Sequence, residues 1–194
     1  MANIIAFEGI PGAGKTTAIN TLLKNGSLFN CAVVPELYMG KLDSLSGSKS
    51  YLDAEIDKSS IINDTKNHYD NILLDRTFLS TIAYCYAKSK VDGDASTYLD
   101  LLRYFKYLDS KHNLIRPTCL FYLNITIPES IKRREKFSKI DELHNWFDPE
   151  FLKHFSEFYD QKMNRFNMPG CILIDTTNLS KGSVTKKIMS ILKK

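Results

Sequence analysis

Short apolar runs alternate with longer amphipathic stretches along the whole chain. Strand-length runs rich in Ile, Val, Leu, Phe and Tyr occur at residues 3–7, 31–34, 72–74, 118–123 and 171–174. Several of these runs are nearly continuous, which is typical of parallel strands covered on both faces. Stretches with helical periodicity separate them, at residues 15–24, 50–68, 77–88, 95–108, 128–137, 149–166 and 183–192. The alternation predicts an α/β fold, in which a parallel sheet is covered by helices on both faces.

Length and composition favour one domain. The chain has 194 residues, of which 43% are hydrophobic, and this is enough for one well-buried core but hardly for two. We therefore expect residues 1–194 to form a single domain. The net charge of +4 comes from lysines spread along the chain, with no run of five basic residues. This spread favours small anionic ligands and argues against a nucleic-acid partner.

The cysteines and the lengths of the apolar runs indicate in which cellular compartment the protein is expected. The four cysteines contain no CxxC pair, and they lie in apolar runs, so we expect reduced, buried thiols. No stretch approaches the roughly 20 apolar residues that a membrane-spanning helix needs, and the first residues lack the pattern of a signal peptide. These observations predict a cytoplasmic protein with no membrane partner.

Residues 9–16 read GIPGAGKT and match the pattern G-x-x-x-x-G-K-[ST] in full. They follow an apolar strand and precede a helix, so several backbone N–H groups and the positive end of the helix dipole meet at one point. Lys15 adds a positive charge for the outer phosphates, and Thr16 supplies a hydroxyl that can hold Mg²⁺. An ordinary glycine turn with a surface lysine is the alternative. We expect a nucleoside triphosphate, ATP, to be bound with Mg²⁺ by Gly9, Pro11, Gly12, Ala13, Gly14, Lys15, Thr16 and Thr17.

The ends of the other predicted strands carry further candidate residues, because ligands of such sheets bind beyond the carboxyl ends of the strands. Glu36 follows the second strand and could act as a general base or orient a sugar hydroxyl. Asp75 and Arg76 close the third strand, and they suit Mg²⁺ and a phosphate, respectively. The alternatives are a surface glutamate for Glu36 and a helix-capping pair for Asp75 and Arg76.

The segment after the fourth strand is strongly cationic. Within IPESIKRREKFSKIDE, five cations lie in eight positions: Lys132, Arg133, Arg134, Lys136 and Lys139. Phosphoryl transfer spreads negative charge over several oxygens, and fixed positive charge stabilises it. We expect residues 129–142 to form a short cationic lid; a solvated helix face with i,i+4 pairs is the alternative.

Aromatic residues are abundant, and most suit a hydrophobic core. Phe151, Phe155 and Phe158 fall at helical spacing and predict core packing. Tyr38 and Tyr84 are better candidates for stacking on an acceptor base.

Three segments together resemble a known superfamily. FEGIPGAGKTT, DRTFLSTIAY and PESIKRREKF look like the nucleoside and nucleotide kinases of the P-loop superfamily, and most like thymidylate kinases and their deoxynucleoside kinase relatives. The thymidylate kinase pattern DRY-x-x-S-x-x-A-Y-Q is matched in register by Asp75, Arg76, Ser80, Ala83 and Tyr84. The motifs cover about a fifth of the chain, and we expect the fold of this superfamily, a five-stranded sheet in the order 2-3-1-4-5.

The resemblance also implies roles for individual residues. Lys15, Arg134 and Lys136 would stabilise the transferred phosphoryl group, while Thr16 and Asp75 would hold Mg²⁺. Arg76 would hold the acceptor's phosphate or the transferred one. Arg133 would stack on adenine, and Asp175 to Asn178 would border it. Family relatives are usually dimers, which implies a homodimer by analogy.

The departures from thymidylate kinases fall in the acceptor site. Thr77 stands where that family has Tyr, Cys85 where it has Gln, and the second strand leads into Pro35-Glu36-Leu37-Tyr38 instead of Arg-Glu-Pro-Gly-Gly. Glu36 occupies the place where deoxynucleoside kinases carry their base, which favours a hydroxyl acceptor. The sequence leaves a nucleoside and a nucleoside monophosphate both open. Two rivals also remain: a kinase of a non-nucleoside small-molecule hydroxyl, and a nucleotide-binding regulatory protein without turnover.

Overall fold

The computed structural model describes the chain except for residues 1, 27, 38–41, 43, 138–140 and 194. Five strands alternate with helices: β1 Asn3–Glu8, β2 Cys31–Val34, β3 Asn71–Asp75, β4 Cys119–Asn124 and β5 Cys171–Asp175. The α-helices are α1 Lys15–Lys24, α2 Leu45–Thr65, α3 Phe78–Asp92, α4 Ser96–His112, α5 Ile127–Arg133, α6 Pro149–Gln161 and α7 Lys181–Leu192. Three 3-10 helices lie at Glu135–Phe137, Asp141–Phe147 and Met163–Phe166.

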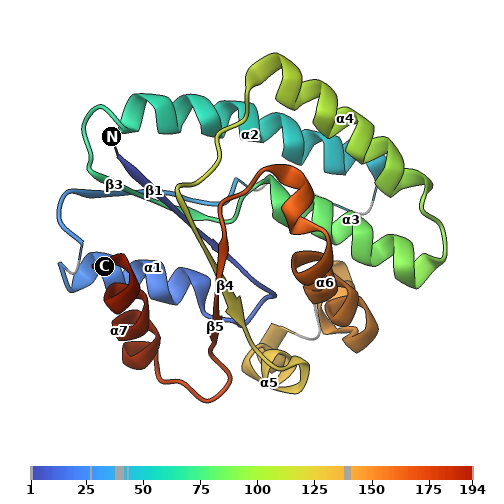
Figure 1. Ribbon diagram of the computed structural model, residues 1–194. Coiled ribbons are helices and arrows are strands. Elements are labelled where there is room, and N and C mark those ends of the chain that lie inside the picture. The colour runs from blue at the N-terminus through green and yellow to red at the C-terminus, as the bar shows by residue number, and fades with distance from the viewer. Residues whose placement is uncertain (1, 27, 38–41, 43, 138–140, 194) are drawn as a thin grey trace.

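The strands form one parallel sheet in the order β2-β3-β1-β4-β5. This confirms the predicted α/β fold and strand order. Helices α1 and α7 lie side by side on one face, and α2, α3, α4 and α6 cover the other (Figure 1). Because all five strands run the same way, the residues that follow β1, β2, β3, β4 and β5 meet at one edge of the sheet.

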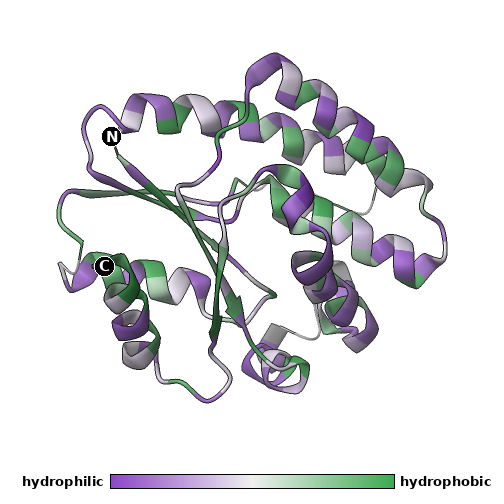
Figure 2. Ribbon diagram, in the orientation of Figure 1, coloured by the Kyte–Doolittle hydropathy of each residue, from purple (hydrophilic) through white to green (hydrophobic). Residues whose placement is uncertain are grey.

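The core lies on both faces of the sheet, and Figure 2 shows the strands as largely hydrophobic. Phe7 of β1 and Phe121 of β4 are paired in register, and their stacked ring centroids are 5.6 Å apart. Phe151, Phe155 and Phe158 of α6 are buried, as their helical spacing predicted. Burial of one such ring contributes about 1.5–3 kcal/mol, and Phe151 and Phe158 contact Tyr84 and Tyr86, so these residues fix α6 against α3.

Several helix boundaries differ from the sequence expectation: α3 and α4 continue to Asp92 and His112, and α6 already ends at Gln161. Helix α2 begins at Leu45 rather than at residue 50, because the Ser44 hydroxyl caps it by accepting a hydrogen bond from Gly47 N at 3.1 Å. Helix α5 ends at Arg133, and Arg134 leaves the helical conformation with φ −114° and ψ 7°. The cationic segment is therefore a short helix followed by a 3-10 turn. Within the described part of the chain, no helix is long and apolar enough to cross a membrane.

Candidate active site

The phosphate loop, residues 9–16, has a backbone that requires its glycines. Gly9, Gly12 and Gly14 have φ values of 137°, 83° and 98°, which side chains rarely tolerate. A Cβ on Gly9 would also lie 2.3 Å from the carbonyl oxygen of Leu123. Gly14 stands at the N-cap of α1, and no side chain caps that helix. The first N–H groups of α1 are therefore directed at the cavity in front of the loop, where an anion would be held.

Lys15 is buried within the loop. Its Nζ donates to the carbonyl oxygens of Gly9 at 2.9 Å and Ile10 at 3.3 Å. Burial, and then the nearby Arg76 guanidinium, lower the pKa of Lys15 from 10.5 to about 7. An incoming triphosphate would favour the charged form, so the ammonium is ready to exchange loop carbonyls for phosphate oxygens.

Thr16 and Asp75 form a pair of hard oxygen ligands. Thr16 Oγ1 donates to Asp75 Oδ2 at 2.6 Å, although the two residues come from α1 and the end of β3. Magnesium is usually held by one or two carboxylates together with substrate phosphates, and a hydroxyl and a carboxylate beside the phosphate loop fit this chemistry. Among the described residues, no group of three or more His, Cys, Asp or Glu is placed to hold a metal ion.

Arg76 is buried in the left-handed region of the backbone, with φ 68°. This conformation costs on the order of 1 kcal/mol for a residue with a side chain. The Nε donates to Glu36 Oε2 at 3.0 Å, and Nη1 donates to Ser80 Oγ at 2.9 Å. Burial alone would lower the pKa of Arg76, but Glu36 and then Glu8 outweigh it and hold that pKa above its ordinary value. The guanidinium is therefore a permanent, fixed cation at the cavity.

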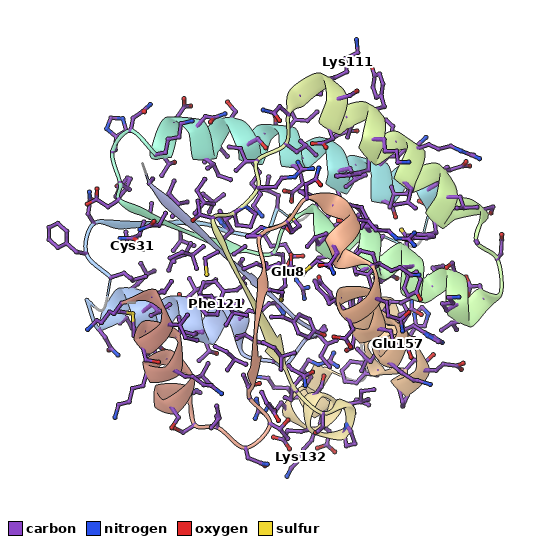
Figure 3. The ribbon with its side chains drawn as sticks, viewed as in Figure 1. Glu8, Cys31, Lys111, Phe121, Lys132 and Glu157 are labelled. Atoms are coloured by element: carbon purple, nitrogen blue, oxygen red, sulfur yellow. The ribbon has the colours of Figure 1, made fainter. Side chains whose placement is uncertain are left out.

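Glu8, the last residue of β1, anchors the start of α3. The sequence pattern did not indicate a role for it. It is fully buried near the centre of the molecule, whereas Lys111 and Lys132 point outwards (Figure 3). Its carboxylate accepts hydrogen bonds from Thr77 N at 2.8 Å, Thr77 Oγ1 at 2.7 Å, Ser80 Oγ at 2.6 Å and Tyr159 OH at 2.8 Å. Four donors compensate the buried charge, so Glu8 ties β1 to the start of α3 and to α6.

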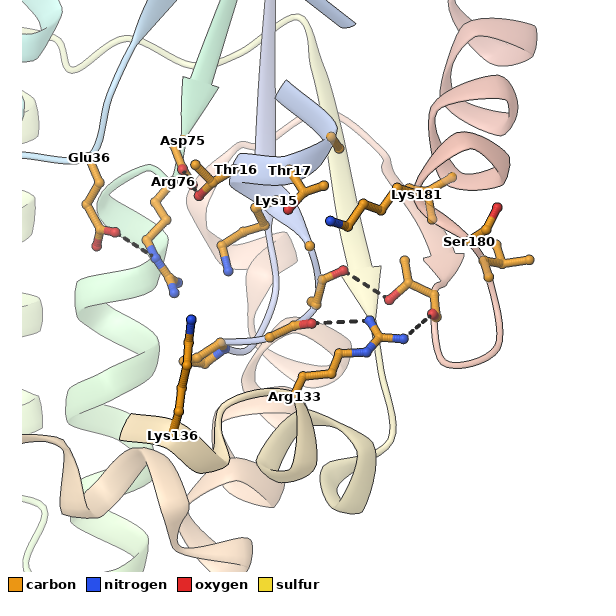
Figure 4. A pocket seen from close by; sticks show the side chains of 18 residues that line it. Lys15, Thr16, Thr17, Glu36, Asp75, Arg76, Arg133, Lys136, Ser180 and Lys181 are labelled. Carbon is orange, nitrogen blue, oxygen red and sulfur yellow. Dashed lines mark hydrogen bonds and ion pairs between the residues drawn. The ribbon is translucent and has the colours of Figure 1, made fainter. Parts of the chain in front are cut away.

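Lys15, Thr16, Asp75 and Arg76 line one cavity of about 960 Å³. Lys15, Arg76 and Lys136 direct their charged ends into the same space, and Glu36 lies at its edge (Figure 4). The lining contains most of the predicted residues together with Ala18, Leu179, Ser180, Lys181 and Val184, which were not predicted. It consists of Pro11, Gly12, Ala13, Gly14, Lys15, Thr16, Thr17, Ala18, Glu36, Asp75, Arg76, Arg133, Lys136, Thr176, Leu179, Ser180, Lys181 and Val184.

The predicted lid residues take different positions. Arg133 bridges two loops: Nη1 donates to Gly12 O at 3.3 Å, and Nη2 donates to Thr177 O at 2.9 Å. Lys136 lines the cavity. Arg134, by contrast, packs its guanidinium over the Phe147 ring and donates to Trp146 O, outside the cavity lining. Residues 138–140, with Lys139 among them, lie outside the described residues.

Three other predicted residues do not line the cavity. Gly9 lies beneath it, and its carbonyl accepts from Lys15. Asp175 caps its own turn instead: its Oδ1 accepts from Thr177 N at 2.9 Å, and this bond lowers the pKa of the Asp175 carboxyl. Tyr84 is buried against Trp146 and Phe151. Tyr38 lies outside the described residues.

The sequence missed the far wall of the cavity. Leu179, Ser180, Lys181 and Val184 contribute this wall from the β5–α7 loop and the start of α7. The only available signal was their place after the last strand, at the same edge of the sheet as the phosphate loop. Nothing in their residue types indicates a ligand.

A phosphate loop, a Thr–Asp oxygen pair and converging cations at one edge of this sheet are features of the P-loop fold, and they form a site suited to a phosphate-bearing ligand. No family model matches the chain. The chain is 28% identical over 203 residues to a protein of Methanocaldococcus jannaschii described as "Probable thymidylate kinase", covering 97% of this chain and 95% of that protein. It is also 28% identical to the thymidylate kinase of Prochlorococcus marinus, covering 98% and 95%.

Solved structures share the fold. Deoxyadenosine kinase from M. mycoides superposes with a TM-score of 0.69 at 20% identity, covering 98% of each chain. Thymidylate kinase from Candida albicans superposes with a TM-score of 0.73 at 18% identity, covering 99% of this chain and 91% of that one. Sequence and fold together confirm that the chain is related to the P-loop nucleoside and nucleotide kinases.

Proposed function

We propose that this chain is a kinase that transfers the γ-phosphoryl group of MgATP to the hydroxyl of a nucleoside. Its kinase relatives support the broader activity, ATP-dependent phosphorylation of a nucleoside or nucleotide. The observation that carries the choice of a hydroxyl acceptor is the Glu36 carboxylate, which lines the cavity and pairs with Arg76 at 3.0 Å.

Each group has a task in this reaction. MgATP supplies the activated phosphoryl group, and the protein positions it and stabilises the developing charge. With MgATP bound, the phosphate loop and Lys15 would hold the phosphates, Thr16 and Asp75 would hold Mg²⁺, and Arg133 would lie beside the adenine. Lys136 and Arg76 place positive charge around the transferred group, whereas Arg134 supports the lid through Trp146.

The ion pair explains the preference for a hydroxyl. A hydroxyl acceptor loses a proton during attack, and Glu36, whose side chain is 49% exposed toward the cavity, can accept it. An acceptor phosphate would bring a second anion next to this carboxylate and would compete with it for Arg76. Because Glu36 is half-exposed, its pair with the buried Arg76 adds little stability, and its main effect is on orientation.

A nucleoside monophosphate is the second candidate acceptor. The identity of 28% to two thymidylate kinases favours it, since the names of those relatives denote enzymes that phosphorylate a nucleotide. Arg76 would then release Glu36 and bind the acceptor phosphate, and no general base would be needed.

A phosphotransfer screen with ribo- and deoxyribonucleosides and their 5′-monophosphates separates the two acceptors. We expect ADP formation with at least one nucleoside. Activity confined to monophosphates would assign Arg76 to the acceptor phosphate. ATP binding without turnover on any member of the panel would contradict the proposal and favour a non-nucleoside acceptor or a regulatory protein.

Replacing Asp75 with Asn should raise the Mg²⁺ concentration needed for half-maximal activity by about tenfold or more, because one anionic ligand of the ion is lost. The measurement is a magnesium titration of the initial rate at saturating ATP. Replacing the exposed Asp64 with Asn on α2 is the matched control, and it should leave the titration unchanged. An unchanged titration for D75N would contradict the assignment of Asp75 to the metal.

ATP binding should be accompanied by proton uptake at pH 8. The pKa of Lys15 is about 7 without ligand, so most of the amine is neutral at that pH. The triphosphate favours the ammonium and raises this pKa, so a proton is taken from the buffer. Calorimetry in two buffers of different ionisation enthalpy measures the uptake, and Lys15→Met should abolish it. Equal binding enthalpies for wild type in both buffers would contradict this interpretation.

A further inference from the structure

Lys58 of α2 is a buried lysine far from the phosphate loop in sequence. Its side chain is 2% exposed, although lysine is almost never fully buried unless it is paired. Its Nζ donates to the carbonyl oxygen of Arg76 at 2.7 Å and lies 3.5 Å from that of Asp75. Glu55 Oε1, one helical turn earlier, lies 3.7 Å away and supplies the counter-charge.

The carbonyl that Lys58 binds belongs to the strained residue of the site. Arg76 keeps one sheet bond, from its N–H to Phe7 O at 3.1 Å, and then turns with φ 68°. The turn directs the guanidinium towards the cavity and leads into α3, where Thr77 is the N-cap. Since a side chain disfavours this conformation, surrounding contacts must hold it. A donated bond from an ammonium is among the stronger hydrogen bonds available to a buried carbonyl.

The turn is held from two sides. Glu8 accepts hydrogen bonds from Thr77, the residue after Arg76, and Lys58 donates to Arg76 itself. The first anchor comes from β1 and the second from α2, so the turn is fixed between a strand and a helix. Neither Lys58 nor Glu8 is itself among the residues that line the cavity.

We propose that Lys58 is a positioning residue that fixes the backbone turn at Arg76 and thereby aims the Arg76 guanidinium into the cavity. The kinetic consequence rests on the proposed function, whereas the effect on the position of Arg76 does not. Two measurements therefore separate a failure of this inference from a failure of the proposed function.

The first measurement is optical and needs no activity. Trp146 is the only tryptophan of the chain, and the Arg76 guanidinium lies 6.0 Å from its ring centroid. Replacing Arg76 with Ala removes this cation and defines the emission change expected when the guanidinium leaves. Lys58→Met keeps the apolar stem and removes the ammonium, and it should shift Trp146 emission in the same direction. Unchanged emission for K58M, where R76A changes it, overturns the proposal.

The second measurement is kinetic. K58M should lower kcat by about tenfold or more, because small displacements of a charge-stabilising group are costly. The KM for ATP should change by less than about threefold, because the phosphate loop is untouched. Wild-type kcat for K58M overturns the proposal, whereas absence of turnover in the wild type contradicts the proposed function alone and leaves the optical result to decide.

Controls separate positioning from general loss of stability. Ser59, the next residue of α2, accepts a partly buried hydrogen bond from Ile115 N at 3.2 Å, away from the cavity. Ser59→Ala should lower the melting temperature but leave both kcat and Trp146 emission at wild-type values. If K58M does not fold, Lys58→Gln decides, because its amide keeps a polar group in the buried position: altered emission supports the proposal, and wild-type emission with wild-type kcat overturns it.

Discussion

Replacing Lys15 with Ala should lower kcat for phosphotransfer by about 10²–10³-fold or more, the cost of removing a preorganised charge that faces the transferred group. Lys15 is the buried cation of the phosphate loop, and Figure 4 shows its ammonium directed into the cavity. The measurement is the initial rate of ADP formation at saturating ATP and acceptor. Lys24→Ala, at the exposed end of the same helix, is the matched control and should retain wild-type turnover. Near-wild-type turnover of K15A would contradict the assignment of the phosphate loop.

The same substitution should not impair folding, and the dependence of stability on pH tests this. The pKa of Lys15 is lowered from 10.5 to about 7 in the folded state, so the unfolded chain binds more protons between these values. Keeping the buried amine charged lowers the stability of the folded state. This free-energy penalty is fully present below pH 7 and declines as the pH rises towards 10.5. K15A lacks this penalty. The free energy of unfolding of K15A should therefore exceed that of wild type by the largest amount below pH 7. This difference should shrink as the pH rises, and denaturant titrations at several pH values measure it.

Replacing Glu36 with Gln should lower kcat for a nucleoside by about 10²–10⁴-fold, the usual contribution of a general base. The carboxylate faces the cavity and can accept the hydroxyl proton, whereas the amide cannot. The rate of ADP formation with the best nucleoside of the screen measures the loss. With a monophosphate acceptor, which needs no base, the same variant should lose much less activity.

Glu36 also orients Arg76, so the variant needs a control for lost orientation. Glu36→Asp keeps a carboxylate and should retain more activity than E36Q if proton removal matters. Glu157→Gln removes a carboxylate that pairs with His154 on α6, away from the cavity, and should leave kcat unchanged. A mild loss in E36Q with a hydroxyl acceptor would exclude Glu36 as the base and move the proposal to the monophosphate.

Local and periodic features could be predicted from the sequence. Alternating apolar runs and amphipathic stretches determined the parallel sheet, because burial on both faces imposes that pattern. The phosphate loop is contiguous, and the glycines at 9, 12 and 14 take backbone conformations that few other residues tolerate. The strand-end rule placed Glu36, Asp75 and Arg76 at one edge, and all three line the cavity. These predictions depend on neighbours in sequence or on the direction of the strands.

Which side chains act together depends on how the separate elements pack. Arg133 and Arg134 are adjacent cations, yet one bridges Gly12 and Thr177 while the other packs on Phe147, because α5 ends between them. The cavity wall from the β5–α7 loop has no signature in residue type. The turn at Arg76 and Thr77, which follows β3, is anchored by Lys58 from α2 and by Glu8 from β1. Such contacts depend on the distances that packing sets between separate elements, and a one-dimensional pattern does not contain those distances.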